Sequence, residues 1–585
     1  MSTSKNPFDL MRSQDKSFIR KDISRRTLAK SAAAFSIGTM GLSWTTLPNV
    51  AAQDDRAPAE NQVYRAPSTP NVARTLDMYV SVYDRPFFDC LASVPLFKLN
   101  REFQIENAMC ESYESNEEGT IWTFKIKPDQ LWSDGNTVTA ADWVTTFQWA
   151  ADPAHGWDFS WFWAPDIVNF EEALAGDVPV TDVGVRQGDT EYDLIFETKT
   201  AAPYLPIKLL YSPPLSKAAF EAHGELYNSN PETQCMNGPW LLEEWALDQH
   251  IIMKRNEDYS GDKEAIPVQK LIMKFAPAET HFTLFETGEV DFMEGPAPAE
   301  LQLMEANPDT VDQIYQGVGD FGCFYFFFDT TAAPFDDLKV RQAFSHIVDR
   351  DAMKQAIWTR QANPAYSFLS PGFPASNMDE LASIQAFDPD LARTLLEEAG
   401  YPGGEGFPDL VLNTRGGARP IEYSTAEAYA SSLKQELGIN VEVQMLERPA
   451  FYEQMNANKI QFGFVSYGMD YFDASNMLGV WLTSGRHPWS NEEYDRLVNE
   501  ATVFLGDEAE RTAMFQEAEK ILVEDCPGIF TYFYTPIQFI KPYVTGPALE
   551  PDSNGIAAVH WPGYGTYTTV PEELWISAEA PADRD

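Results

Sequence analysis

The sequence has 585 residues, of which 44% are hydrophobic and 13% are aromatic. This length is too great for a single core and this apolar content argues against disorder, so several packed domains are expected. The 88 Asp and Glu residues outnumber the 42 Lys and Arg residues and give a net charge of −46, which argues against a nucleic acid or an anionic membrane as partner.

The N-terminal region has the order of an export signal. Arg25 and Arg26 precede a weakly apolar segment, residues 31–47, and small residues follow up to Ala52. We predict a twin-arginine signal peptide over residues 1–52, and hence a periplasmic or other extracytoplasmic location. The alternative is that the two arginines cap an ordinary amphipathic helix. No later apolar run reaches the ~18 residues of a membrane span.

Cysteine usage gives little evidence for a metal site. The chain has an odd number of cysteines, so at least one thiol stays free unless it pairs between chains. With no C-x-x-C pair and only seven scattered His, we expect no structural zinc, no other metal and no cofactor. The cysteines are Cys90, Cys110, Cys235, Cys323 and Cys526.

A strand and a capped helix are predicted early in the chain. Residues 120–127 alternate between apolar and polar side chains, which is typical of a half-buried strand. Thr139 and Asp142 then form an acidic variant of the capping box, so a helix should begin there and end before Pro153.

A dense aromatic run follows this helix, from Trp157 to Trp163. Most such residues belong to a core. Trp161 and Trp163 are nevertheless candidates for stacking on sugar rings.

Residues 317–322 spell G-x-G-x-x-G, but the context does not fit a dinucleotide site. A phosphate cradle needs a helix after the glycines, whereas CFYFFFD at 323–329 predicts a strand, and Asp320 would repel a pyrophosphate. We therefore expect a glycine-rich bend between domains. No G-x-S-x-G, H-E-x-x-H or P-loop sequence occurs, so nothing in the sequence argues for an enzyme.

The remaining sequence alternates between helices and strands. Val340, Ala343, Phe344 and Ile347 form the apolar stripe of a core-facing helix. This alternation predicts an α/β fold. Helices are expected at 338–350, 388–399 and 424–437, and strands at 409–413, 440–446 and 460–465.

Charged residues follow two of these strands. Asp470 lies between Tyr467 and Tyr471 after the strand at 460–465, where it could anchor a cation; the alternative is a loop-capping acid. Arg415 and Arg419 follow the strand at 409–413 and could bind a carboxylate, or could be solvated loop charges.

Four elements in order resemble one family, the extracellular solute-binding proteins of family five, which include the dipeptide- and oligopeptide-binding receptors of ABC importers. The elements are residues 124–143, residues 238–261 with Gly238-Pro239-Trp240 and Asn256-Glu257-Asp258-Tyr259-Ser260-Gly261, Gly288-Glu289-Val290-Asp291, and residues 334–350.

This resemblance implies a two-lobed periplasmic-binding-protein-like α/β fold with a hinge. The first lobe should comprise residues 53–318 and 529–585, with an inserted subdomain at about 100–232, and the second lobe residues 319–528. The resemblance also implies a monomeric, non-enzymatic receptor that delivers its ligand to a membrane permease.

The resemblance suggests a role for Asp470 as well. Peptide-binding members carry W-x-x-D-Y here, whose aspartate receives the ligand's α-ammonium, and Tyr467, Asp470 and Tyr471 match with Tyr in place of Trp. We predict a peptide as ligand. An oligosaccharide, which some relatives bind, is the alternative.

Overall fold

The computed structural model describes residues 55–70, 74–83, 92–101, 103–317, 321–416, 420–551, 572–582 and 584. The chain divides into one unit of residues 1–56 and a second unit of residues 57–585, and the fold below is that of the second. The predicted signal peptide, Cys90, Arg419 and Asp320 lie outside the described residues.

A six-stranded sheet organises the second half of the chain. The central strand, β13, is antiparallel to both of its neighbours, β17 and β18, whereas β15 is parallel to β16 and β17. The strand order is β14 (Ala362–Pro364), β18 (Gly528–Tyr534), β13 (Cys323–Phe328), β17 (Phe462–Tyr467), β15 (Leu410–Arg415) and β16 (Val441–Leu446).

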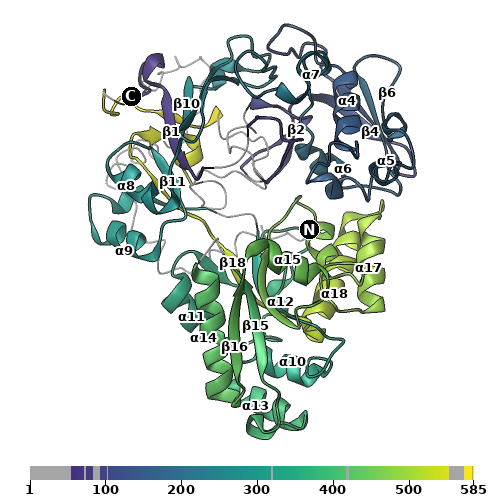
Figure 1. Cartoon of the computed structure of the whole chain (residues 1–585), viewed down its shortest axis with the longest axis vertical. Coiled ribbons are helices and arrows are strands. Elements are labelled where there is room, and N and C mark those ends of the chain that lie inside the picture. The colour runs from purple at the N-terminus through teal and green to yellow at the C-terminus, as the bar shows by residue number, and fades with distance from the viewer. Residues whose placement is uncertain are drawn as a thin grey trace, which may run out of the picture. The chain divides into compact units, whose positions relative to one another are not determined.

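Helices cover both faces of this sheet because β13 is apolar on both sides. Phe324, Phe326 and Phe328 pack with α10 (Leu338–Ser345), α13 (Pro389–Glu398) and α14 (Pro420–Leu437). Tyr325 and Phe327 pack with α15 (Arg448–Asn456), α17 (Glu492–Thr502) and α18 (Glu508–Asp525). Figure 1 shows α14 on one side of the strands and α17 and α18 on the other. The predicted α/β alternation is confirmed. Shorter helices are α11 (Arg350–Met353), α12 (Met378–Leu381) and α16 (Ala474–Leu478).

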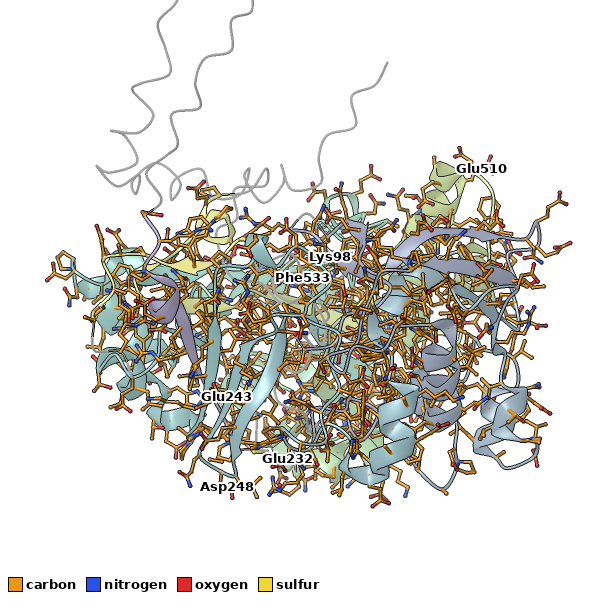
Figure 2. All side chains as sticks on the ribbon, turned by 90° about the horizontal axis from the view of Figure 1, so that it is seen from above. Lys98, Glu232, Glu243, Asp248, Glu510 and Phe533 are labelled. Carbon is orange, nitrogen blue, oxygen red and sulfur yellow. The ribbon has the colours of Figure 1, made fainter. Side chains whose placement is uncertain are left out.

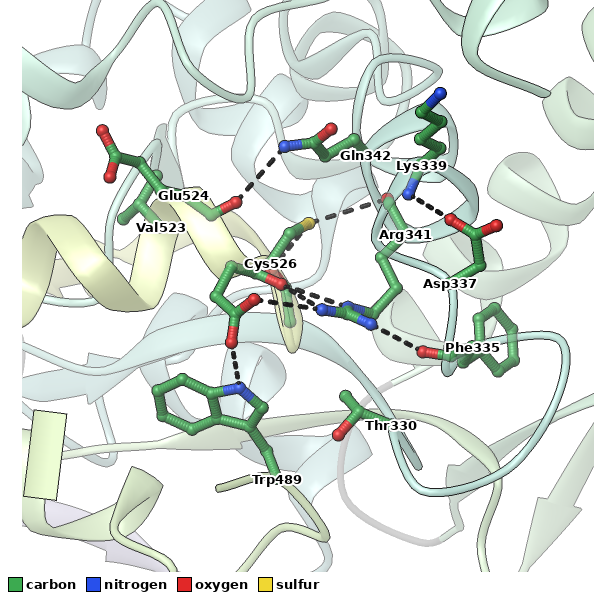
Figure 3. Close-up of polar contacts among 12 residues, drawn as sticks. Thr330, Phe335, Asp337, Lys339, Arg341, Gln342, Trp489, Val523, Glu524 and Cys526 are labelled. Atoms are coloured by element: carbon green, nitrogen blue, oxygen red, sulfur yellow. Dashed lines mark hydrogen bonds and ion pairs between the residues drawn. The ribbon is translucent and has the colours of Figure 1, made fainter. Parts of the chain in front are cut away.

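Arg341 joins α10 to the end of α18 (Figure 3). Its Nη1 donates to the Phe335 carbonyl at 2.8 Å, and its Nη2 donates to the carbonyl of Asp525 at 2.7 Å. The Asp525 carboxylate also accepts from Trp489 Nε1 at 2.6 Å. The four stripe residues predicted from the sequence are all fully buried, but α10 ends at Ser345 and not at residue 350 as predicted, so Ile347 lies just beyond the helix.

A four-stranded sheet and its helices form the inserted subdomain. Trp122, Phe124 and Ile126 of β5 are buried, and the Asp142 carboxylate accepts from the Thr139 N–H at 2.8 Å, so the predicted strand and capping box are confirmed. Its core includes residues from Met78 to Cys235. The elements are β2 (Phe97–Leu99), β3 (Ile105–Asn107), β4 (Cys110–Ser115), β5 (Ile121–Ile126), α4 (Ala140–Ala150), α5 (Phe170–Leu174), β6 (Val185–Gln187), β7 (Asp193–Glu197), α6 (Leu205–Lys208) and α7 (Lys217–His223).

The remaining strands form smaller sheets, with β1 parallel to β10. Strand β19, near the C-terminus, pairs with both β11 and β12. The elements are β1 (Val63–Ser68), β8 (Trp240–Ala246), β9 (His250–Arg255), β10 (Lys270–Phe275), α8 (His281–Glu286), β11 (Phe292–Glu294), α9 (Pro298–Ala306), β12 (Ile314–Gln316), β19 (Ile537–Ile540), β20 (Val544–Thr545) and β21 (Trp575–Ile576).

The second lobe was expected to end at residue 528, but the large sheet extends beyond that residue. Strand β18 runs from Gly528 to Tyr534 between β13 and β14. Residues 528–533 of β18 pair with β13 and residues 532–534 pair with β14. The chain therefore leaves this sheet only after Tyr534.

The surface carries much of the acidic charge. Glu232, Glu243, Asp248 and Glu510 are exposed, and Asp248 and Glu510 lie near the outer edge in Figure 2. The four cysteines within the described residues are buried free thiols. Across the same residues, no helix is long and apolar enough to cross a membrane.

Candidate ligand-binding site

Asp470 lies three residues beyond the end of β17 and is only 3% exposed. Its Oδ2 accepts from the Tyr467 hydroxyl at 2.5 Å and from Asn476 Nδ2 at 3.2 Å. Its backbone N–H donates to Asn476 Oδ1 at 2.8 Å. Neutral groups on both sides therefore fix the position of this carboxylate.

The Asp470 carboxylate forms no ion pair with a described lysine or arginine. Burial raises its pKa, whereas the hydrogen bonds from Tyr467 and Asn476 and the charges of Arg486 and Lys208 act in the opposite direction. A buried charge without a direct counter-ion is costly, so a cation that entered this position would be bound strongly.

Tyr471 connects the Asp470 segment to the inserted subdomain. Its ring stacks on Tyr204 with centroids 5.5 Å apart and meets Phe162 edge-on at 6.0 Å. Lys208 Nζ lies 5.3 Å from the same ring and is itself ion-paired with Asp166. Tyr471, which the sequence suggested as a ligand contact, thus packs between two parts of the chain that are far apart in sequence.

The two candidate tryptophans differ in exposure. Trp161 is 47% exposed, and its Nε1 donates to the Tyr83 hydroxyl at 3.2 Å. Burial raises the pKa of Tyr83, and the nearby charge of Asp470 adds to this increase. Trp163 is fully buried against Phe147. Trp161 therefore has an accessible ring, whereas the burial of Trp163 favours the core interpretation.

Arg415 already has a protein carboxylate as partner. Its Nε and Nη2 donate to the two carboxylate oxygens of Glu422, each at 2.9 Å, and Nη2 also donates to Ser466 Oγ at 2.6 Å. Glu422 is buried. This bidentate pair uses the geometry that a ligand carboxylate would need, so the arrangement favours a structural role for Arg415.

The sequence did not indicate Arg486, Asn476 or Tyr83. Arg486 Cζ lies 4.9 Å from the centroid of the Tyr467 ring, and Asn476 holds Asp470 from six residues away. None of the three belongs to a recognisable motif, so only the fold reveals that they lie near Asp470. For Asn476, the one sequence feature that could have indicated a place near Asp470 is its position in the first helix after β17, α16.

An α/β fold with an anchored, unpaired carboxylate just beyond a sheet strand is typical of a ligand-binding protein. Residues 104–489 match the family model of the bacterial extracellular solute-binding proteins, family 5. The chain belongs to this family.

Curated relatives and a solved structure agree with this assignment. The periplasmic oligopeptide-binding protein OppA of Escherichia coli is 28% identical over 449 residues, which cover 75% of this chain and 81% of OppA. The dipeptide-binding protein DppE of Bacillus subtilis is 28% identical over 475 residues, covering 78% and 84%. The unliganded open form of the periplasmic murein tripeptide-binding protein MppA superposes with a TM-score of 0.72 at 24% identity, covering 88% and 98%. The predicted two-lobed fold is confirmed.

Proposed function

We propose that this protein is the extracytoplasmic receptor of an ABC importer, and that it captures peptides by binding their α-ammonium group at Asp470. The observation that carries the proposal is the buried Asp470 carboxylate, which neutral donors hold and which no described cation pairs with. An ammonium group supplies the missing charge and can donate to Oδ1 of the same carboxylate. The similarity to the oligopeptide-binding protein OppA and the dipeptide-binding protein DppE supports peptides as the ligand class.

Closure of two lobes around the ligand is the proposed mechanism. We assign residues 57–317 and the segment after 534 to the first lobe, and residues 321–534 to the second. The two connections run side by side: the Gly317 N–H donates to the Pro536 carbonyl at 2.9 Å, and the Tyr534 N–H donates to the Gly322 carbonyl at 3.2 Å. Two connections that lie side by side allow rotation about one axis, which is the expected form of a hinge.

Ligand binding favours the closed conformer because only that conformer surrounds the ligand. In the closed form Tyr471 packs on the inserted subdomain, and the ligand amine lies at Asp470. The membrane permease then receives the ligand. The receptor acts as a monomer, performs no chemistry on the peptide and reaches its location by twin-arginine export.

The test is a thermal-shift panel of short peptides and oligosaccharides on the mature protein, followed by mass spectrometry of the recovered ligand. Peptides should raise the melting temperature by mass action and should be recovered unchanged. Stabilisation by oligosaccharides alone would contradict the peptide assignment and would favour stacking on Trp161. Cleavage of the peptide would contradict the receptor assignment.

A further inference from the structure

Phe103 belongs to the inserted subdomain, but its side chain packs in the core of the second lobe. It lies in the turn between β2 and β3, where its N–H donates to the Asn100 carbonyl at 3.1 Å. The side chain is only 6% exposed. Among the described residues, it is the one member from before residue 321 in the buried cluster that contains Tyr325 and Phe327. The β2–β3 hairpin therefore reaches from one lobe into the other.

Three aromatic rings of the second lobe surround Phe103. The Phe103 ring meets Phe321 edge-on with centroids 4.9 Å apart, and it stacks on Phe472 at 5.4 Å with the two planes inclined by 20°. Phe373 completes the cluster, because its ring lies 5.4 Å from that of Phe321 and 5.0 Å from that of Phe472. All four side chains are hydrocarbon, so this contact between the lobes depends on apolar burial and ring packing.

Both sides of this contact are held in place by their own lobe. The loop that carries Phe373 is fixed by Glu519, whose carboxylate accepts from the N–H groups of Leu369 and Asn377 at 3.0 and 2.9 Å. On the other side, Phe103 has a φ of 59°, a left-handed conformation that bulky residues rarely adopt. Such a conformation persists only where the surrounding contacts compensate for it.

The exchange of aromatic side chains between the lobes is reciprocal. Tyr471 of the second lobe packs against the core of the inserted subdomain, and Phe103 of the subdomain packs in the core of the second lobe. Tyr471 and Phe472 directly follow Asp470, so the proposed ligand anchor is adjacent to both contacts. Rotation about the hinge moves Phe103 relative to Phe472 and Phe373, and opening of the lobes therefore exposes these rings to water.

We propose that Phe103 is a latch, which stabilises the closed conformer without contacting the ligand and so strengthens the binding of every peptide by the same factor. This inference rests on the proposed function, in which the lobes close around a peptide. A residue that acts only on the balance of open and closed conformers changes the fraction of receptor that can hold the ligand, and the apparent Kd varies inversely with that fraction. The Phe103 ring has no polar atom to offer a peptide.

Calorimetry and small-angle scattering on the mature protein compare the wild-type protein with Phe103→Ala. The probes are Ala-Ala, Ala-Phe-Ala and Ala-Lys-Ala-Ala, which differ in length and side chains. All three should bind the variant more weakly by a common factor of about fivefold or more, because the variant loses a buried ring from the closed conformer only. If the empty wild-type protein is already mainly closed, the latch appears instead as a larger radius of gyration of the empty variant.

Phe103→Leu is the matched control, since it keeps an apolar side chain and loses the ring; its loss of affinity should be smaller and equally uniform. Melting temperatures verify folding, and if Phe103→Ala does not fold, Phe103→Leu serves for the same comparison. Two results would overturn the inference while peptide binding itself stood. One is unchanged scattering of the empty variant together with affinities within about threefold of wild type. The other is a set of losses that differ among the peptides by more than about threefold, which would indicate contact with the ligand.

If no peptide bound the wild-type protein, the proposed function would fail, and the two empty proteins would still test the latch. A larger radius of gyration of Phe103→Ala would support it, and equal radii would overturn it.

Discussion

Tyr471 stacks on Tyr204 with the two rings inclined by only 22°. Tyr204 belongs to the core of the inserted subdomain, whereas Tyr471 directly follows Asp470. The ligand anchor and a contact between two distant parts of the chain are thus adjacent residues. Binding at Asp470 and packing of Tyr471 should therefore be energetically coupled.

Removal of this stack should weaken ligand binding. Tyr471→Ala deletes the ring, and because an aromatic pair contributes about 0.5–1.5 kcal/mol beyond its buried area, peptide affinity should fall by at least a few-fold. Tyr471→Phe is the control: it keeps the ring and removes only the hydroxyl, which lies 3.2 Å from Ser475 Oγ. Calorimetry measures both. Equal affinities for the two variants would show that the stack does not contribute to binding.

Glu519 should give the protein an unusual pH dependence. This fully buried side chain accepts from the backbone N–H groups of Leu369 and Asn377 at 3.0 and 2.9 Å. Burial raises its pKa to about 7, although these hydrogen bonds act in the opposite direction.

The sign of the effect follows from proton uptake. Between its ordinary pKa and about 7, Glu519 holds a proton in the folded state that it releases on unfolding. Its contribution to the free energy of unfolding should thus fall as pH rises through this window, by at most about 3–4 kcal/mol. Urea unfolding of the wild-type protein and of Glu519→Gln at several pH values in this window measures the contribution of Glu519. A difference between the two proteins that stays constant with pH would contradict the assignment.

Arg341 should be essential for stability. Arg341→Met leaves the carbonyls of Phe335 and Asp525 and the half-buried Asp525 carboxylate without this donor, and each acceptor left unpaired away from water typically costs about 1–3 kcal/mol. Arg341→Lys keeps the charge and should cost less. Urea unfolding compares the two variants. If Arg341→Met lowered the free energy of unfolding by less than about 1 kcal/mol, Trp489 and water alone would be sufficient hydrogen-bond donors for the Asp525 carboxylate.

Export should depend on Arg25 and Arg26. With both changed to Lys, the precursor should accumulate in the cytoplasm, because twin-arginine export requires the pair itself and not only its charge. Lys30→Arg, a change of similar size in the same segment, should be exported normally. Cell fractionation and immunoblotting measure this. Normal export of the double variant would rule out the twin-arginine route.

The sequence predicts elements whose pattern is local. The apolar stripe of α10 and the Thr139–Asp142 capping box depend on spacings of a few residues, which the backbone geometry determines directly. The position of Asp470 beyond a buried strand also follows from local order along the chain.

Other features depend on contacts between distant residues. Arg415 and Glu422 are seven residues apart across a strand-to-helix connection. No local pattern in the sequence shows whether Arg415 pairs with a carboxylate of the protein or with one of a ligand. Arg486 approaches Tyr467 only because the chain returns after α16. The end of the large sheet at Tyr534 likewise follows from the pairing of β18 with β13, which a family-based boundary at residue 528 did not capture.

Calorimetry on Asp470→Asn tests the central claim most directly. The substitution keeps the shape of the side chain and removes its charge, so a free-amine peptide should bind about 30-fold to several thousand-fold more weakly than it binds the wild-type protein, a loss of about 2–5 kcal/mol. The same peptide with an acetylated N-terminus should bind the wild-type protein weakly and lose little more in the variant, since both changes remove one interaction. Binding of the free-amine peptide by Asp470→Asn within about threefold of the wild-type affinity would contradict the account and would leave Asp470 as a loop-capping acid.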